Sequence, residues 1–424
     1  MRKNSLFELI KLNTYWFGLS FMWTSLHTLI LPALILQYVP DERKNTTLGL
    51  LTFTGLIIAA IVQPLSGAAS DRWASRFGKR RPAIVFGTLC DMVFLALMAY
   101  AGGIPLLALS YVGLQFTSNI AHGPAQGLMH DKVPSEQMGM ASGIKNMFDM
   151  SGVVVSSLVV GFIFTVETPL AAFIGIALAL VLGATFTVFG VHEGSTAAEK
   201  NGEPILTRFR NSLRIDRKQH GNYWRLLLVR FLFLSGVYGI QVFAQYFIRD
   251  VLQVENPIEF TGSMLAVIVL ALMLFSIIAG RIADRIGRKP MHTLAAVTVC
   301  VGSILLTIAR QPTSVLIIGS VVGAGIGVFL SANWALANDL APLGEGGKFL
   351  GLTNLATAGA GAMSRLLGLP IDAVNNLRPG EYLGYNVLFL SAAVMSIVSL
   401  LILRKVPEQI NPRRTQVVDI RSDR

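Results

Sequence analysis

The sequence predicts an all-α integral membrane protein with twelve transmembrane helices. Hydrophobic residues make up 53% of the 424 positions and charged residues only 14%, whereas soluble domains carry about 25% charged residues. A window of about 20 residues, the length that crosses a bilayer core, finds twelve apolar runs with the charged residues mainly between them. Composition and spacing therefore exclude a water-soluble fold.

The predicted spans follow one another closely, apart from one longer polar interval that separates six spans from six. In chain order they are Tyr15–Tyr38, Leu48–Ala69, Ala83–Tyr100, Leu106–Met129, Met140–Val166, Leu170–Val191, Tyr223–Phe247, Phe260–Ala279, Met291–Ile308, Ser314–Leu336, Phe349–Leu369 and Tyr385–Leu403. Several are longer than the bilayer core requires, which suits tilted helices. We expect a first bundle over 1–192, a cytoplasmic loop over 193–222, a second bundle over 223–408 and a tail over 409–424.

The basic residues indicate how the chain crosses the membrane. Loops rich in Lys and Arg stay in the cytoplasm, and most of the 35 Lys and Arg residues lie in loops on the N-terminal side. The opposite loops hold Arg43, Lys44, Arg249, Arg310 and Arg378. No small-residue cleavage site follows the first apolar run, so we expect a retained N-terminus. Both termini are thus predicted to be cytoplasmic, in a plasma or inner membrane, and the net charge of +11 reflects topology rather than nucleic-acid binding.

Motifs for enzyme or metal chemistry are absent from the sequence. The two cysteines, Cys90 and Cys300, lie in separate apolar runs, so neither a disulfide framework nor a cysteine metal site is expected. No phosphate-binding loop, HExxH or GxSxG motif occurs, which argues against direct use of ATP and against hydrolytic chemistry. We expect no cofactor, no metal and no enzyme activity.

The two sets of six spans repeat one another. Three matches are 208 residues apart: Tyr15-Trp16 with Tyr223-Trp224, Asp131-x-x-Pro134 with Asp339-x-x-Pro342, and Gly143-x-x-Asn146 with Gly351-x-x-Asn354. A fourth match is a loop motif in two parts, of which the first is 213 residues apart and the second 209. It reads Gly67-x-x-x-Asp71-Arg72 then Gly78-Lys79-Arg80, and Gly280-x-x-x-Asp284-Arg285 then Gly287-Arg288-Lys289.

This doubled loop in a six-plus-six chain resembles the major facilitator superfamily over essentially the whole length. The resemblance implies two parallel-related six-helix bundles that bind substrate between them near the membrane midplane. It also implies a secondary active transporter that works by alternating access.

The chemistry of the loop suits a gate. Gly67 and Gly280 allow helices to approach closely, and Asp71 and Asp284 can accept hydrogen bonds from a helix N-terminus or pair with the adjacent arginine. We expect a gating set of Gly67, Asp71, Arg72, Gly78, Lys79, Gly280, Asp284, Arg285, Gly287 and Arg288. The alternative is that the basic members only fix the topology.

A narrower resemblance is confined to the first half. The stretches from Ser70 to Pro82 and from Asn119 to Gln126 resemble motifs of sucrose/proton symporters and related glycoside transporters. However, Gln115 and Gln126 stand where that group has a carboxylate and an arginine, so neither proton coupling nor sucrose carries over. The resemblance implies a sugar or glycoside as the substrate class.

Polar stripes mark the expected cavity. Gln115, Asn119, His122 and Gln126 share one helical face by their spacing. In the superfamily spans one, four, seven and ten line the cavity, which adds Trp23, His27, Tyr238, Gln241, Gln245, Trp334 and Asn338. Amides and aromatic rings suit a polyhydroxylated solute. The tryptophans could equally be packing or interface residues, and the histidines hydrogen-bonding groups.

Three ionisable residues inside the spans are candidates for ion coupling. Lys145 and Asp149 are one helical turn apart and can pair, whereas the repeat has Thr353 and Thr357 at these positions. Asp91 lies about 13 Å into its span, where burial disfavours the charged form of a carboxyl. The alternative is that these groups only form permanent ion pairs. For Arg230 and Arg365, gating or snorkelling is favoured over anion binding.

The predicted function is secondary active transport of a small polar solute such as a sugar or glycoside, coupled to a proton or sodium ion. The partners are then the solute, the ion and the lipid bilayer, with no nucleic acid, and the protein is expected to be a monomer. Two alternatives stay open: an exporter of amphipathic compounds, and a non-transporting relative that delivers a pigment or cofactor.

Overall fold

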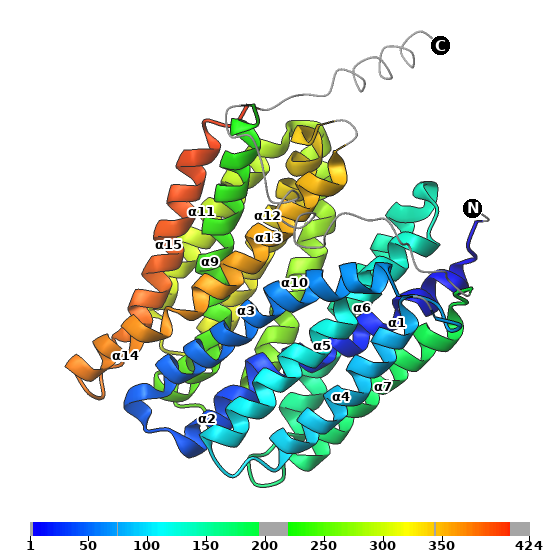
Figure 1. The fold of residues 1–424 in the computed structure, drawn as a ribbon. Coiled ribbons are helices and arrows are strands. Elements are labelled where there is room, and N and C mark those ends of the chain that lie inside the picture. Colours follow the sequence, from blue (N-terminus) through cyan, green and yellow to red (C-terminus); the bar gives the residue numbers. More distant parts are fainter. Residues whose placement is uncertain (1–2, 74, 195–218, 343–344, 408–424) are drawn as a thin grey trace. The chain divides into compact units, whose positions relative to one another are not determined.

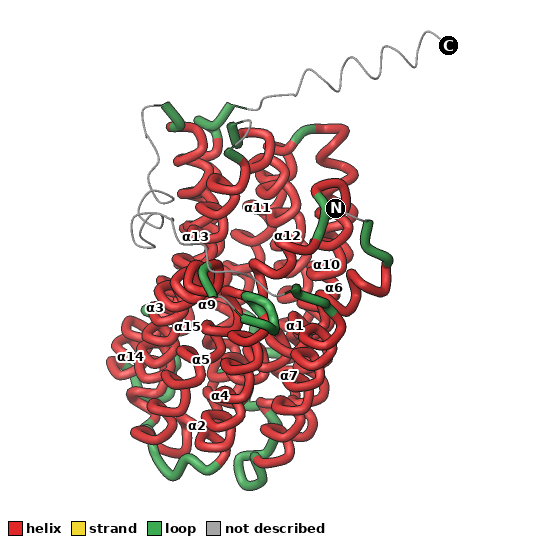
Figure 2. The backbone as a smooth tube through the Cα atoms, turned by 45° about the vertical axis from the view of Figure 1, so that its right-hand side comes forward, coloured by secondary structure: helices red, strands yellow, loops and turns green. Residues whose placement is uncertain are grey.

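The computed structural model describes residues 3–73, 75–194, 219–342 and 345–407. Within these ranges the chain forms helices and loops and contains no strand (Figure 2). Eleven of the described helical stretches are long and apolar enough to cross a membrane. The predicted all-α fold is confirmed.

The helices follow the predicted apolar runs, and several extend beyond them because their polar ends continue the same backbone geometry. They are α1 (Leu6–Thr24), α2 (Leu31–Tyr38), α3 (Lys44–Asp71), α4 (Arg81–Ala99), α5 (Ile104–Lys132), α6 (Met138–Ile163), α7 (Leu170–Gly190), α9 (Gly221–Asp250), α10 (Pro257–Ile286), α11 (Arg288–Ile308), α12 (Pro312–Leu340), α13 (Gly346–Arg365), α14 (Gly368–Leu377) and α15 (Gly384–Leu403). Short turns of other helical types are Ser25–Ile30, Asp41–Arg43 and Ser135–Gln137.

The predicted eleventh span, Phe349–Leu369, differs most from the structure. It falls on α13, which ends at Arg365 and is followed by a separate helix, α14. Its sequence is rich in the small residues Gly and Ala, and it is not among the eleven apolar spans. Small residues lower the mean hydropathy of a helix and allow neighbouring helices to approach closely.

The first helix starts earlier than its apolar run because a capping box fixes its N-terminus. The Ser5 hydroxyl accepts a hydrogen bond from the Glu8 backbone N–H, and the Glu8 carboxylate accepts one from the Ser5 N–H at 2.6 Å. Two otherwise unpaired backbone donors are satisfied in this way. The helix therefore begins at Leu6, before the predicted start at Tyr15.

The first span is interrupted by the π-helical turn Ser25–Ile30, and Pro32 explains where it occurs. Proline has no N–H to donate to the carbonyl of Thr28, four residues earlier. With its side-chain amide turned so that the nitrogen faces these acceptors, Gln245 donates instead to the backbone oxygens of Thr28 and Leu29, each at 3.0 Å. The widened turn carries His27, and π-turns of this kind are frequent at functional sites.

The described helices form two compact units. The first unit lies within Met1–Ser212, Gln241–Val269 and Arg365–Tyr385, and the second within Leu213–Ile240, Leu270–Ser364 and Asn386–Arg424. The predicted division into bundles over 1–192 and 223–408 remains a prediction. Most of the predicted loop 193–222 and the whole predicted tail 409–424 lie outside the described residues.

In the first unit, α1 packs tightly against α6 and α7, as Figure 1 shows. A Cβ atom on Gly152 of α6 would lie 2.6 Å from the backbone oxygen of Phe17, and one on Gly18 of α1 would lie 2.7 Å from that of Ala179. Only glycine allows such an approach. The contact at Gly152 brings the polar residues of α6 next to those of α1.

A buried ionic cluster joins distant segments of the first unit. Lys44, at the start of α3, pairs with Asp250 at 2.6 Å, and both side chains are almost fully buried. The Tyr385 hydroxyl donates to the same carboxylate at 2.6 Å, and Arg249 pairs with Asp41 at 2.9 Å. Each buried charge of this cluster thus has a partner, as burial requires.

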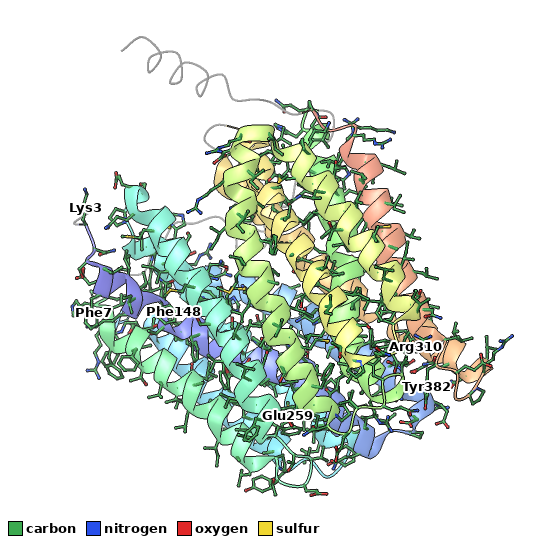
Figure 3. All side chains as sticks on the ribbon, turned by 180° about the vertical axis from the view of Figure 1, so that it is seen from behind. Lys3, Phe7, Phe148, Glu259, Arg310 and Tyr382 are labelled. Atoms are coloured by element: carbon green, nitrogen blue, oxygen red, sulfur yellow. The ribbon has the colours of Figure 1, made fainter. Side chains whose placement is uncertain are left out.

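The second unit has an apolar core between α9, α11, α12 and α13. Phe233 and Phe329 stack at its centre with ring centroids 3.7 Å apart. Large apolar side chains also project outward from the helices, for example Leu274, Ile304 and Ile317, and Figure 3 shows such side chains along the helices. An apolar exterior suits contact with lipid.

Candidate functional site

A cavity of about 330 Å³ lies in the first unit. Its wall comes from α1, α5 and α6 and consists of Trp16, Leu19, Ser20, Trp23, Thr24, His122, Lys145, Asp149 and Met150. The structure thus brings together five residues that the sequence singles out. They are Trp23, His122, Lys145 and Asp149 from the predicted set and Trp16 from the internal repeat.

The charged part of the cavity is the pair on α6. Lys145 Nζ lies 2.6 Å from Asp149 Oδ2, and each side chain is about one-quarter exposed or less. The Ser20 hydroxyl donates to the other oxygen of Asp149 at 3.0 Å. The pairing predicted from the one-turn spacing is present, and the carboxylate also receives a neutral donor from α1.

Aromatic rings surround this pair. Lys145 Nζ lies 3.9 Å from the centre of the Trp16 ring, a favourable cation–π geometry. His122 meets the same ring edge-on, with centroids 5.1 Å apart. The cavity is therefore lined by an acid, a cation, an imidazole and two indole side chains.

Three other predicted cavity residues form a buried polar cluster instead. His27 Nε2 lies 2.9 Å from the Tyr111 hydroxyl, and the Gln115 amide donates to that hydroxyl at 2.8 Å. The Asn119 amide donates to the Gln115 backbone oxygen at 2.7 Å. The His27 ring stacks on Trp23 with centroids 5.1 Å apart, so this cluster lies directly behind a wall of the cavity.

Asp91 is separate from the cavity. Its residue is fully buried, and Oδ1 accepts a hydrogen bond from the Thr117 hydroxyl at 2.5 Å. It does not line the cavity with Lys145 and Asp149. Of the predicted coupling residues, the structure therefore groups two and leaves Asp91 apart.

The remaining predicted cavity residues are distributed between the units. In the first unit the Gln245 side chain is buried against the π-helical turn, whereas that of Gln241 is exposed. Gln126 is also exposed, and its side chain lies beside His122. In the second unit Trp334 is partly exposed and Asn338 donates to its backbone oxygen at 2.8 Å, while Tyr238 packs against the core of that unit.

Arg80 organises the predicted gate of the first unit. Its guanidinium pairs with Asp71 and, at 3.0 Å, with Asp131, and it donates to the Gly67 backbone oxygen at 2.9 Å. Lys79 also pairs with Asp131, at 3.0 Å. The partner of Asp71 is thus Arg80 rather than the expected Arg72, because Gly78 adopts a left-handed φ of 95° and turns the loop back.

The second unit repeats this arrangement. Gly287 has a φ of 99°, and Arg288 pairs with Asp284 at 2.9 Å and with Asp339 at 3.3 Å. Here too, the described ion pair of the first aspartate, Asp284, is with Arg288 rather than with the adjacent Arg285. Each loop is therefore a triad of one arginine and two aspartates, and both second aspartates belong to the repeated Asp-x-x-Pro motif.

Several residues of these sites could not be assigned from the sequence. Arg80 and Asp131 stand out there only as a basic anchor and as a repeat marker, although the doubling of both motifs links them. Ser20 and Tyr111 give no usable signal, since a lone Ser or Tyr in an apolar run is ordinary. Asn333 directly precedes Trp334, a predicted cavity residue of α12, but the helical spacing does not single it out.

The family comparison covers most of the chain. Residues 16–364 match the model described as Major Facilitator Superfamily. Among curated relatives, the chain is 30% identical over 144 residues to "Proton-associated sugar transporter A" of Mus musculus, which is 30% of this chain and 19% of that protein. The match thus spans about a fifth of the length of such relatives.

A longer match is weaker in identity. The chain is 21% identical over 332 residues, 77% of this chain and 80% of the other, to "Multi-drug resistance efflux pump PmrA" of Streptococcus pneumoniae. Among solved structures it resembles nucleoside transporter NupG, with a TM-score of 0.72 and 14% identity over 95% of this chain and 99% of that one. It also resembles a D-xylose-proton symporter, with a TM-score of 0.67 and 16% identity over 95% of this chain and 98% of that one.

Proposed function

The chain belongs to the Major Facilitator Superfamily and is a multi-pass membrane transporter, and we propose that it carries a small polyhydroxylated solute together with a proton. One observation carries this proposal: a carboxylate–ammonium pair and two indole rings line a single cavity of about 330 Å³. That volume is at the lower end of the range of about 300–1,000 Å³ typical of small-molecule sites. The similarity to a protein named as a proton-associated sugar transporter supports the same substrate class.

The geometry favours a proton over a sodium ion as the coupling ion. A sodium ion beside Asp149 would face the ammonium of Lys145, which already lies 2.6 Å from the carboxylate, and like charges at such range repel strongly. A proton can instead bind covalently to the carboxyl oxygen. Asp149 is therefore the proposed proton acceptor, and Lys145 the group whose ion pair is weakened when the proton arrives.

The solute then forms hydrogen bonds with the groups that the broken ion pair releases. Once Asp149 is protonated, the Lys145 ammonium can donate to a hydroxyl oxygen, and Ser20 and His122 can exchange hydrogen bonds with neighbouring hydroxyls. The Trp16 and Trp23 rings cover the C–H faces of a sugar ring. Proton and solute thus favour each other's binding, which is the linkage that symport requires.

The paired triads are the proposed gate on the cytoplasmic side. Arg80 and Arg288 each tie a loop after a long helix to the end of another helix. We expect these ties to break and re-form as the transporter alternates. Both termini are proposed to lie on that same side, as the distribution of basic residues indicates.

The proposal is tested by uptake into proteoliposomes. Purified protein should accumulate labelled monosaccharides or glycosides only when an inward proton gradient is imposed. Asp149→Asn should abolish accumulation but keep solute exchange, since the neutral residue cannot release a proton. Glu136→Gln removes an exposed carboxylate just before α6 and serves as the matched control, with uptake like that of the wild type. Accumulation by Asp149→Asn would contradict the proposal.

A second candidate is export of amphipathic compounds. The match to a multidrug efflux pump covers 77% of this chain, and indole faces also suit flat apolar cations. The same liposomes can be loaded with a fluorescent amphipathic cation. Proton-driven extrusion of that dye, without sugar uptake, would favour this second function.

A further inference from the structure

A buried arginine in the second unit has only neutral partners among its described contacts. Arg230 of α9 is 6% exposed, and its guanidinium donates from Nε to the Thr357 hydroxyl and from Nη1 to Asn333 Oδ1, each at 2.7 Å. The Asn333 amide nitrogen lies 3.2 Å from His292 Nε2. Side chains of α12 and α13 thus fix the orientation of the guanidinium but bring no negative charge.

The acidic residues described in this unit do not balance that charge. They are Asp284, Asp339 and Glu345. The two aspartates pair with Arg288, and the glutamate pairs with Lys348 at 3.7 Å. A buried charge without a counter-charge is strongly unfavourable. The sequence favours gating or snorkelling for Arg230, and in the structure its described hydrogen bonds are to residues inside the unit.

The internal repeat locates the missing acid. Thr357, which accepts from Arg230, stands 208 residues after Asp149, and Thr353 stands 208 residues after Lys145. In the first unit the acid is part of the chain, whereas at the repeated position the chain has a neutral hydroxyl. Among the described residues of this unit, no acid therefore takes the place that Asp149 has in the first unit.

We propose that Arg230 binds the carboxylate of a sugar acid such as a uronate, at a site within the second unit. Two of the five N–H groups of the guanidinium are used by Asn333 and Thr357, which leaves N–H groups for the two oxygens of a carboxylate. Trp334 lies beside the site, with its ring centre 5.7 Å from the guanidinium carbon. Its partly exposed face can cover the adjoining sugar ring.

The same positive site could take a free anion such as chloride, so the experiment must separate the two sources. The probes are D-glucuronate, D-glucose, acetate and chloride, titrated by calorimetry into the purified full-length chain. We expect glucuronate to bind about tenfold or more tightly than glucose, in line with hydrogen bonds to a charged group. Acetate should compete weakly, and chloride should not displace glucuronate.

Two variants remove the site in different ways. Arg230→Gln deletes the cation, and Thr357→Asp supplies an internal carboxylate to Arg230 while leaving every other partner in place. Both should weaken glucuronate binding about tenfold or more, and Thr357→Asp should not unfold the protein because it neutralises a buried charge. The neutral isostere Thr357→Asn should bind about tenfold or more tightly than Thr357→Asp.

The matched control is on the same helix. Arg225 is exposed and bonds only Asn222 at 2.8 Å among its described hydrogen bonds, so Arg225→Gln should bind glucuronate like the wild type. Equal binding of glucose and glucuronate, saturation by chloride with displacement of glucuronate, or full binding by Thr357→Asp would each overturn the proposal.

A binding assay keeps this inference distinct from the proposed function, on which only its transport consequence rests. If glucuronate binds through Arg230 but no solute is moved with protons, the proposed proton-coupled transport fails and the site stands. If neutral sugars are transported with protons and glucuronate does not bind, the proposed transport stands and the Arg230 site is contradicted.

Discussion

Each of the two units holds a cation inside a span, but they balance it differently. In the first unit Lys145 is paired at 2.6 Å with Asp149, one turn away on the same helix. In the second unit Arg230 is held by Thr357 and Asn333, both neutral. This difference falls at equivalent positions of the internal repeat, since Asp149 and Thr357 are 208 residues apart. The first unit therefore supplies its cation with an internal acid, for which we propose proton exchange, whereas the described partners of the second unit's cation are neutral and we propose an external anion.

The largest effect is expected when the first unit is given the residues of the second. In Lys145→Thr/Asp149→Thr no group of the pair remains to release a proton, so gradient-driven accumulation should disappear completely. The pair is removed together, which avoids a lone charge. Each single substitution should therefore lower the thermal unfolding midpoint more than the double variant does.

A double-mutant cycle in proteoliposomes and in thermal unfolding checks this expectation. If the four proteins show additive changes in unfolding midpoint, the two side chains do not act as a pair. If the double variant still accumulates solute against a gradient, Asp149 is not the coupling acid.

A smaller effect should distinguish the two loop triads. Arg80 is more deeply buried than Arg288, with side chains 6% and 13% exposed. Each arginine donates to a backbone carbonyl, and Arg80 also donates to the Ser70 hydroxyl. Arg80→Gln should lower the unfolding midpoint by about 4 °C, and Arg288→Gln by about half as much. Differential scanning fluorimetry on both variants would reveal the order, and the opposite order would show that the triads are not graded by burial.

The smallest effect concerns the two tryptophans beside the cations. Lys145 lies 3.9 Å from the Trp16 ring centre, whereas Arg230 lies 5.7 Å from that of Trp334. Trp16→Phe should lower the free energy of unfolding by about 0.5–1 kcal/mol, the usual size of such an interaction, and Trp334→Phe by less. Calorimetry on the two variants tests the ranking, which a larger loss for Trp334→Phe would reverse.

Much of the fold could be predicted from the sequence, because apolar run length sets membrane helices directly. The α6 ion pair was also predictable, since a spacing of four residues fixes neighbours on one helix. The fold family followed from the doubled loop. The residues of the proposed gate were predicted only in outline, because the partner of Asp71 depends on a glycine turn that brings back Arg80, nine residues later.

The rest of the candidate site depends on contacts between helices. Nothing in the sequence around His27 shows that Tyr111 will meet it, or that Gln245 will satisfy the carbonyls left by Pro32. By its position in the sequence Arg230 is close enough to a helix end to snorkel, and only its contacts with α12 and α13 show that it turns inward. Spacing along one helix carries no information about which other helix lies opposite.

The central claim is that one unit contributes an acid and the other a cation to the same transport cycle. The most direct test is labelled glucuronate uptake in proteoliposomes in which the pH gradient and the membrane potential are set independently. One proton on Asp149 and one carboxylate on Arg230 carry no net charge, so we predict uptake that follows the pH gradient and ignores the potential. Uptake driven by the potential alone, or glucose uptake equal to that of glucuronate, would contradict the claim.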